Sequence, residues 1–200
     1  MDKTRETTID INQIPYLTWT WLKINKDSVS YDFSLTENKG NEAQIPEGIN
    51  VSSGKSISTN LPEPSFSIGQ EAAKLISDAT KEGKIYTVEK STSQPLIIRI
   101  KLDSNSATHQ IIHAKAGTAA NIIIIYEGQA ELAGVITKVY AEDDSKLHIS
   151  KVQLCGNNVI ASHLHSDVFC LAIYEPSGTR NVETFYKAIL KRTREAFHIS

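Results

Sequence analysis

From residue 95 onward, the sequence is a succession of short segments rich in isoleucine, valine and threonine. These segments are 95–102, 108–116, 120–128, 134–142, 145–154, 159–166 and 168–175. β-Branched residues suit the pleated surface of a sheet, and no segment of helix length separates the runs. The pattern therefore predicts an all-β array of many short strands, which excludes a helical bundle for this half of the chain.

The connections between these segments leave two architectures open. Asn-Gly and Asp-Gly pairs, which two-residue hairpins need, are scarce, whereas AKAGTAAN at 114–121 and CGNN at 155–158 are typical of longer corners. Such corners suit a parallel β-helix, in which inward aliphatic side chains stack from coil to coil. Periodicity alone does not separate a β-helix from a β-sandwich.

Residues 1–94 have a different character and form the N-terminal region of the chain. They are polar and loop-rich, and they contain one clear helical pattern, which we expect at 68–82. Ser67 and Gln70 make a possible capping box before it, and Gly83 stands where a glycine ends many helices. We therefore expect a small mixed region followed by a β core over 95–200.

Composition limits the partners and the compartment. The formal net charge of −2 gives no electrostatic attraction to nucleic acid or to an anionic membrane. The first ten residues are charged and lack the apolar segment of a secretory signal, and two cysteines do not make a disulfide framework. We expect a cytoplasmic protein that works without nucleic acid or membrane.

Several of these segments resemble the SufB/SufD family. PLIIRIKLDSNSATHQIIHAKAGTAANIIIIYEG is similar to the opening strands of that family's core domain, and ITKVYAEDDSKLHISKVQLCGNN is similar to the strand pair that follows. IPYLTWTWLKIN at 14–25 resembles the family's entry motif. The matching positions of the first stretch are Ile112, Ala114, Ala120, Ile122, Ile124 and Tyr126.

The resemblance implies a right-handed parallel β-helix that follows a small helical N-terminal region. It also implies a non-enzymatic scaffold for iron–sulfur cluster assembly, which acts with an ABC-type ATPase and a SufB/SufD-type partner subunit. A transient iron–sulfur cluster would be its cargo rather than a resident cofactor. The chain ends at TREAFHIS without the family's C-terminal Cys/His-Gly-Ala-Thr-type segment, so the resemblance is to a C-terminally truncated member.

The last part of the chain gives conflicting signals. In 181–197, Val182, Phe185, Tyr186 and Ile189 follow helical spacing, which favours a helix that would cap the end of a shortened solenoid. The resemblance would instead continue the β-helix through this segment. Open solenoid ends also favour association, so a homo-oligomer is compatible with the sequence.

One group of residues is a candidate metal or cluster site. Cys155 is followed by His163 and His165, which would lie on one face of a strand about 7 Å apart. One thiol and two imidazoles are a thin ligand set for an iron–sulfur cluster or for zinc, and a corner cysteine with a polar strand face is the more ordinary explanation. The same two histidines support a rival function, a cupin-like or β-helix metal-dependent enzyme. A catalytic triad motif and a phosphate-binding loop are both absent from the sequence.

Two further pairs of residues are candidates for binding. Trp19 and Trp21 are candidates for partner docking, although one of them could pack in the N-terminal core. His109 and His113 would lie on one strand face about 13 Å apart, too far to share an ion. We expect these two histidines to be exposed on the surface of their strand.

Overall fold

The computed structural model describes residues 7–11, 27–31, 34–58, 70–130, 132–155 and 182–186. Within them the chain is mostly β-strand, with a single helix, α1 (Gln70–Ala79). The strands are β1 (Thr7–Ile11), β2 (Asp27–Tyr31), β3 (Thr36–Glu37), β4 (Glu42–Gln44), β5 (Ile49–Ser53), β6 (Lys84–Val88), β7 (Leu96–Leu102), β8 (Ser106–Ala114), β9 (Ala119–Gly128), β10 (Ala133–Ala141), β11 (Lys146–Cys155) and β12 (Val182–Tyr186).

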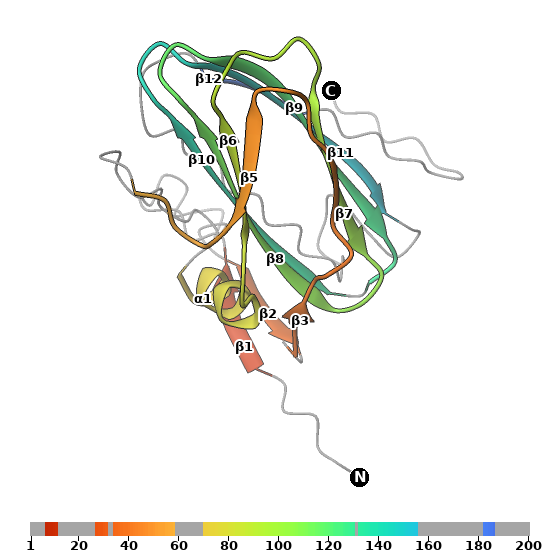
Figure 1. Ribbon diagram of the computed structural model, residues 1–200. Coiled ribbons are helices and arrows are strands. Elements are labelled where there is room, and N and C mark those ends of the chain that lie inside the picture. The colour runs from red at the N-terminus through yellow and green to blue at the C-terminus, as the bar shows by residue number, and fades with distance from the viewer. Residues whose placement is uncertain are drawn as a thin grey trace, which may run out of the picture.

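The strands form two five-stranded sheets and one separate pair. The β6 sheet has the order β10-β8-β6-β5, with β3 also paired to β8, and the β7 sheet has the order β12-β11-β9-β7-β4. β1 pairs with β2 alone. Figure 1 shows the two sheets curled as a half-barrel around a common interior, with α1 and the β1–β2 pair at one end.

The strands from β6 to β11 alternate between the two sheets, and each pairs in parallel with the next strand of its own sheet. The pairing offset is nearly constant. Gln110 pairs with Lys84, 26 positions earlier, and Ala133 pairs with Ser106, 27 positions earlier. The β7 sheet has the same offsets, 26 between Leu96 and Ile122 and 27 between Ala119 and Lys146. Each repeat of this length therefore contributes one strand to each sheet.

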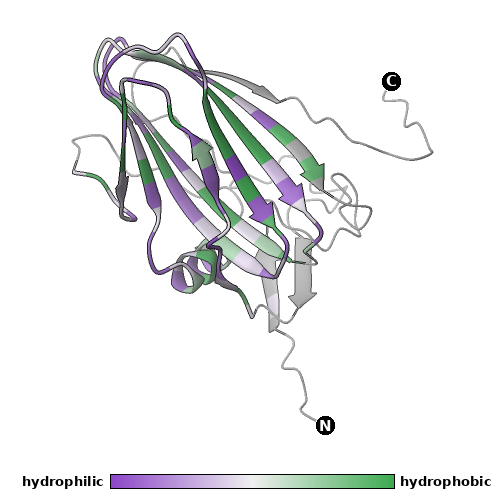
Figure 2. Ribbon diagram, turned by 45° about the vertical axis from the view of Figure 1, so that its right-hand side comes forward, coloured by the Kyte–Doolittle hydropathy of each residue, from purple (hydrophilic) through white to green (hydrophobic). Residues whose placement is uncertain are grey.

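The hydrophobic core lies between the two sheets. In β7 every second side chain is buried, and the same positions of β9 and β11 continue the core, so isoleucines stack across the sheet. Figure 2 shows the resulting bands of hydrophobic and hydrophilic residues along the strands. The stacked core positions of this sheet are Leu96, Ile98, Ile100, Leu102, Ala120, Ile122, Ile124, Tyr126, Leu147 and Ile149.

The β6 sheet differs because β8 and β10 are buried on both faces. α1 covers part of the outer face, where Ile76 packs with Ala107 and Ile136. Gly134 lies under the helix, and a Cβ at this position would overlap the Ile76 side chain. Burial on both faces explains why these two strands do not show a clean alternation of polar and apolar residues.

The predicted strands from 95 to 154 are confirmed as β7 to β11, with bounds that differ by one or two residues. The helix expected at 68–82 is confirmed as α1. It ends where the Thr80 hydroxyl and amide both donate to the Ile76 carbonyl, and Gly83 has another role, described below. Residues on both sides of position 94 share one core, because Ile49 and Val88 belong to it.

The helix predicted over 181–197 is wrong for Val182–Tyr186, which forms β12 and pairs in parallel with Leu147–Lys151 of β11. The unpaired backbone groups of β11 offer this segment hydrogen bonds that outweigh its helical spacing, and its sequence, VETFY, has β-favouring residues. The predicted strands at 159–166 and 168–175 lie outside the described residues. In the part of the chain that is described, α1 is too short and polar to cross a membrane.

Candidate functional site

The residues predicted to bind metal or a cluster are not brought together within the described structure. Cys155 is the last residue of β11, and its backbone is in register with Gly128 of β9. His163 and His165 lie outside the described residues, as do the candidate docking residues Trp19 and Trp21. Over the six described ranges, no group of three or more His, Cys, Asp or Glu side chains could hold a metal ion.

The structure instead brings charged residues together at a pair of stacked turns. The turn Lys115–Thr118 joins β8 to β9, and the turn Glu142–Ser145 joins β10 to β11, 27 positions later. In the first turn, the Thr118 amide and hydroxyl donate to the Lys115 carbonyl at 3.1 and 2.6 Å. In the second, the Ser145 amide and hydroxyl donate to the Glu142 carbonyl at 3.1 and 2.6 Å. The two turns therefore have the same hydrogen bonding in successive repeats.

The third residue of each turn has a left-handed backbone. Gly117 has a φ of 70° and Asp144 a φ of 57°. Glycine adopts this conformation without strain, and aspartate is among the few other residues that tolerate it. The Gly117 amide donates to the Asp143 carbonyl at 2.9 Å, so the turns are also bonded to each other.

Stacking of the two turns places Glu142 against Lys115 and His113. One carboxylate oxygen of Glu142, Oε1, lies 2.8 Å from His113 Nε2 and 3.2 Å from Lys115 Nζ. The other, Oε2, accepts a hydrogen bond from the Ala116 amide at 3.1 Å. We call these four residues, His113, Lys115, Ala116 and Glu142, the turn cluster.

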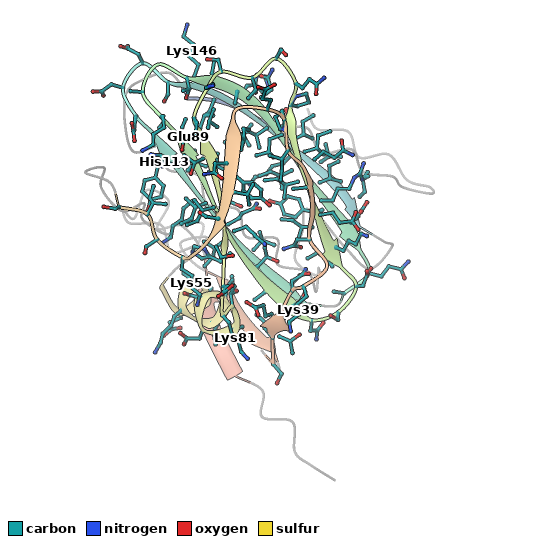
Figure 3. The ribbon with its side chains drawn as sticks, in the orientation of Figure 1. Lys39, Lys55, Lys81, Glu89, His113 and Lys146 are labelled. Carbon is teal, nitrogen blue, oxygen red and sulfur yellow. The ribbon has the colours of Figure 1, made fainter. Side chains whose placement is uncertain are left out.

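His113 is the buried member of the turn cluster. Its side chain is 5% exposed, and its ring meets that of Tyr140, its register neighbour on β10, edge to face with 6.4 Å between the centroids. Figure 3 shows His113 of β8 near Glu89, the residue that follows β6, with Lys146 beyond them where β11 begins. Glu142 is 29% exposed and Lys115 41% exposed, so the cluster runs from the protein interior to the surface.

The hydrogen bonds set the charge state of Glu142. Burial by itself would raise the pKa of this carboxyl, but the hydrogen bonds from His113, Lys115 and the Ala116 amide outweigh burial and hold the pKa below its ordinary value. Glu142 is therefore ionised at neutral pH. Both of its oxygens already accept hydrogen bonds from the chain itself, so the arrangement stabilises the stacking of two turns rather than presenting a free general base.

The expectation that His109 and His113 are exposed is wrong. Counted over the whole residue, His109 is 3% exposed and His113 is 4% exposed. Both project from the outer face of β8, which is covered. Gly83 is required beside His109: a Cβ there would lie within 2.9 Å of the His109 ring and closer still to the Gly54 carbonyl oxygen.

The turn cluster was missed because its members are far apart in sequence. The signal was the similarity of the corners KAGT and EDDS at an interval of 27 residues.

Comparison with known proteins gave no match: no family model, curated protein or solved structure is significantly similar to this chain.

Proposed function

We propose that this protein is a non-enzymatic scaffold of the SufB/SufD type, built as a right-handed parallel β-helix, that takes part in iron–sulfur cluster assembly. The observation that carries the proposal is the offset of 26 to 27 residues at which strands of both sheets pair in parallel. A constant offset is expected when each coil of a solenoid stacks on the previous one. The motif resemblance at residues 95–155 lies on the strands that carry this offset.

The turns support a structural role for the stack. Hydrogen bonds connect successive corners, from the Lys115 amide to the Val88 carbonyl and from the Glu142 amide to the Ala114 carbonyl. The turn cluster adds charged contacts between the same corners. A stack that is bonded both along its strands and at its corners suits a rigid platform for other proteins.

The hydrogen bonding of the turn cluster suits a scaffold better than an enzyme. The best-formed cluster, around Glu142, satisfies its own carboxylate with three donors from the chain. Catalytic groups instead need lone pairs or protons that can reach a substrate. Chemistry in the assembly would then belong to the partners, an ABC-type ATPase and a SufB/SufD-type subunit, in a cytoplasmic complex.

Cys155, His163 and His165 remain the proposed contacts for a transient cluster. Cys155 is the last residue of β11 and is in register with Gly128 of β9. Trp19 and Trp21 remain the proposed residues for docking of a partner.

Affinity purification of the tagged protein from its native cells under anaerobic conditions tests this proposal. We expect an ABC-type ATPase and a SufB/SufD-type subunit to co-purify, and their yield to fall for the double variant Trp19→Ala/Trp21→Ala. The matched control is Asp143→Ala, an exposed change at a turn that should leave both partners bound. Purification of the wild-type chain with neither partner, under conditions in which the ATPase is expressed, would overturn the proposal.

A further inference from the structure

β5 lies at the end of the β6 sheet and has, among the described residues, a strand on one side only. It pairs antiparallel with β6 and has the sequence INVSS, with no charged residue and no proline. Asn50, Ser52 and Ser53 are exposed and Val51 is half-buried. Natural edge strands are commonly protected from other chains by charges, prolines or bulges, and β5 has none of these within its five residues.

The hydrogen bonds around β5 show which of its backbone groups point outward. The Glu89 amide donates to the Gly48 carbonyl at 2.9 Å, and the Gly54 amide donates to the Gly83 carbonyl at 3.0 Å. In an antiparallel pair such bonds alternate along the strand, so positions of even number, including Asn50 and Ser52, direct their backbone groups to β6. The amide and carbonyl of Val51 and of Ser53 therefore point to the open edge.

We infer that β5 is a dimerisation edge, which pairs antiparallel with β5 of a second copy of this chain across a two-fold axis at Val51. Two-fold symmetry makes Val51 face Val51 and Ile49 face Ser53 of the second copy. In both the Val51–Val51 pair and the Ile49–Ser53 pair, the backbone amide and carbonyl groups point away from β6 to the open edge, as a hydrogen-bonded pair requires. The β6 sheets of the two copies then form one continuous sheet.

Charge complementarity favours a second copy as the occupant of this edge. A residue near a two-fold axis lies close to its own symmetry mate, so any charge there would be repelled, and β5 carries none. At the flanks of the strand the same register places Glu47 opposite Lys55 of the second copy, and the reverse. Glu47 is exposed and Lys55 is half-buried, with its Nζ donating to the Ser77 carbonyl of α1 at 2.7 Å.

Two further features point to the same edge. Ile45, in the connection between β4 and β5, is 48% exposed, and it is one of two exposed large hydrophobic residues in the part of the chain that is described. The edge of the other sheet is less suited, because β4 has three residues and begins with Glu42, whose carboxylate pairs with Lys101.

Sedimentation analysis of three proteins tests the hydrogen bonding of the edge. We expect a wild-type dimer whose dissociation constant rises more than about tenfold in Val51→Pro, because proline removes an outward amide from both central positions. Proline at an outward position leaves the β5–β6 pairing intact, and circular dichroism checks this. Val51→Ile retains the amide and should dimerise like the wild type. A monomeric wild type at high concentration, or a Val51→Pro protein that dimerises equally well, would overturn the inference.

Cysteine cross-linking tests the register and does not depend on the proline variant folding. In the inferred dimer, the two Val51→Cys positions form a directly opposed pair with Cα atoms about 5.5 Å apart, within the range of a disulfide. Asn50 faces Ser52 of the second copy, so two Asn50→Cys positions are diagonal neighbours about 7–8 Å apart, too far for a disulfide. We expect oxidation to link Val51→Cys and not Asn50→Cys, with mass spectrometry separating this link from any through Cys155 or Cys170. Equal linking of both variants, or of neither, contradicts the register. The dimer requires neither ATPase nor cluster, so this result stands apart from the proposed function.

Discussion

Replacement of Glu142 with alanine removes the acceptor that connects the two stacked turns, and its cost can be built from the contacts. The His113 side chain is 5% exposed and would lose its partner at 2.8 Å, which costs about 1–3 kcal/mol for a buried polar group. Lys115 is 41% exposed and hydrated, so its ion pair adds about 0.5 kcal/mol or less. The Ala116 amide can bond to water instead. We expect Glu142→Ala to reduce the free energy of unfolding by about 2 kcal/mol.

Urea denaturation at neutral pH, followed by circular dichroism, measures this change. Asp143→Ala is the matched control, because Asp143 is the next residue of the same turn and is exposed. We expect the control to stay within about 0.5 kcal/mol of the wild type. If Glu142→Ala costs no more than Asp143→Ala, the turn cluster does not stabilise the stack and our account of it is wrong.

The pH dependence follows from the lowered pKa of Glu142. A carboxyl whose pKa is lower in the folded than in the unfolded chain stabilises the fold above the unfolded pKa, and this contribution is lost as pH falls through the folded pKa. The stability difference between the wild type and Glu142→Gln should therefore be steady from neutral pH down to the ordinary carboxyl pKa of 4.5, and should shrink below it. A difference that grows on acidification would contradict the assignment.

Four further substitutions test the turns, the helix packing and the core by chemical denaturation. Gly117→Ala should lower the free energy of unfolding by about 1 kcal/mol, and Asp144→Gly should raise it by up to about 1 kcal/mol, because both positions have a left-handed backbone. A Cβ at Gly117 would contact nothing within 4 Å, so the backbone alone sets the cost there. Equal effects of the same sign would refute this reasoning. Gly134→Ala should cost about 1–3 kcal/mol by displacing Ile76, and the loss should be smaller in an Ile76→Val background. Ile124→Ala, at a position with no exposed surface, should cost about 3–4 kcal/mol, and a loss below about 1 kcal/mol would place Ile124 outside the core.

The sequence was sufficient to locate β7 to β11 and the helix, because both have a local signal, whereas β1 to β6 lie in the region expected to be loop-rich and β12 was expected to be helical. Stacked isoleucines such as Ile122 and Ile124 alternate with less buried neighbours, and this alternation marks β9 directly. Apolar residues of α1 recur at helical spacing, so the helix was found within a few residues of its bounds. Local patterns carry this information because each residue's environment repeats along its own element.

The turn cluster could not be located in the same way, because it depends on the register between strands. Glu142 meets His113 only when β10 is placed on β8 with an offset of 27 residues, and nothing within either strand fixes that offset. His113 was expected to be exposed for a related reason. A polar residue at an alternating position resembles a solvent-facing one until the cover on the outer face of β8 is known. β12 likewise depends on the edge that β11 offers.

Anaerobic cluster assembly with purified components tests the scaffold function most directly. The ABC-type ATPase, the partner subunit, iron, sulfide and ATP are combined with and without this protein, and cluster formation is followed by visible absorption. We predict that cluster yield depends on this protein, and that Cys155→Ala lowers the yield while the complex stays assembled. An equal yield with and without this protein would contradict the scaffold function.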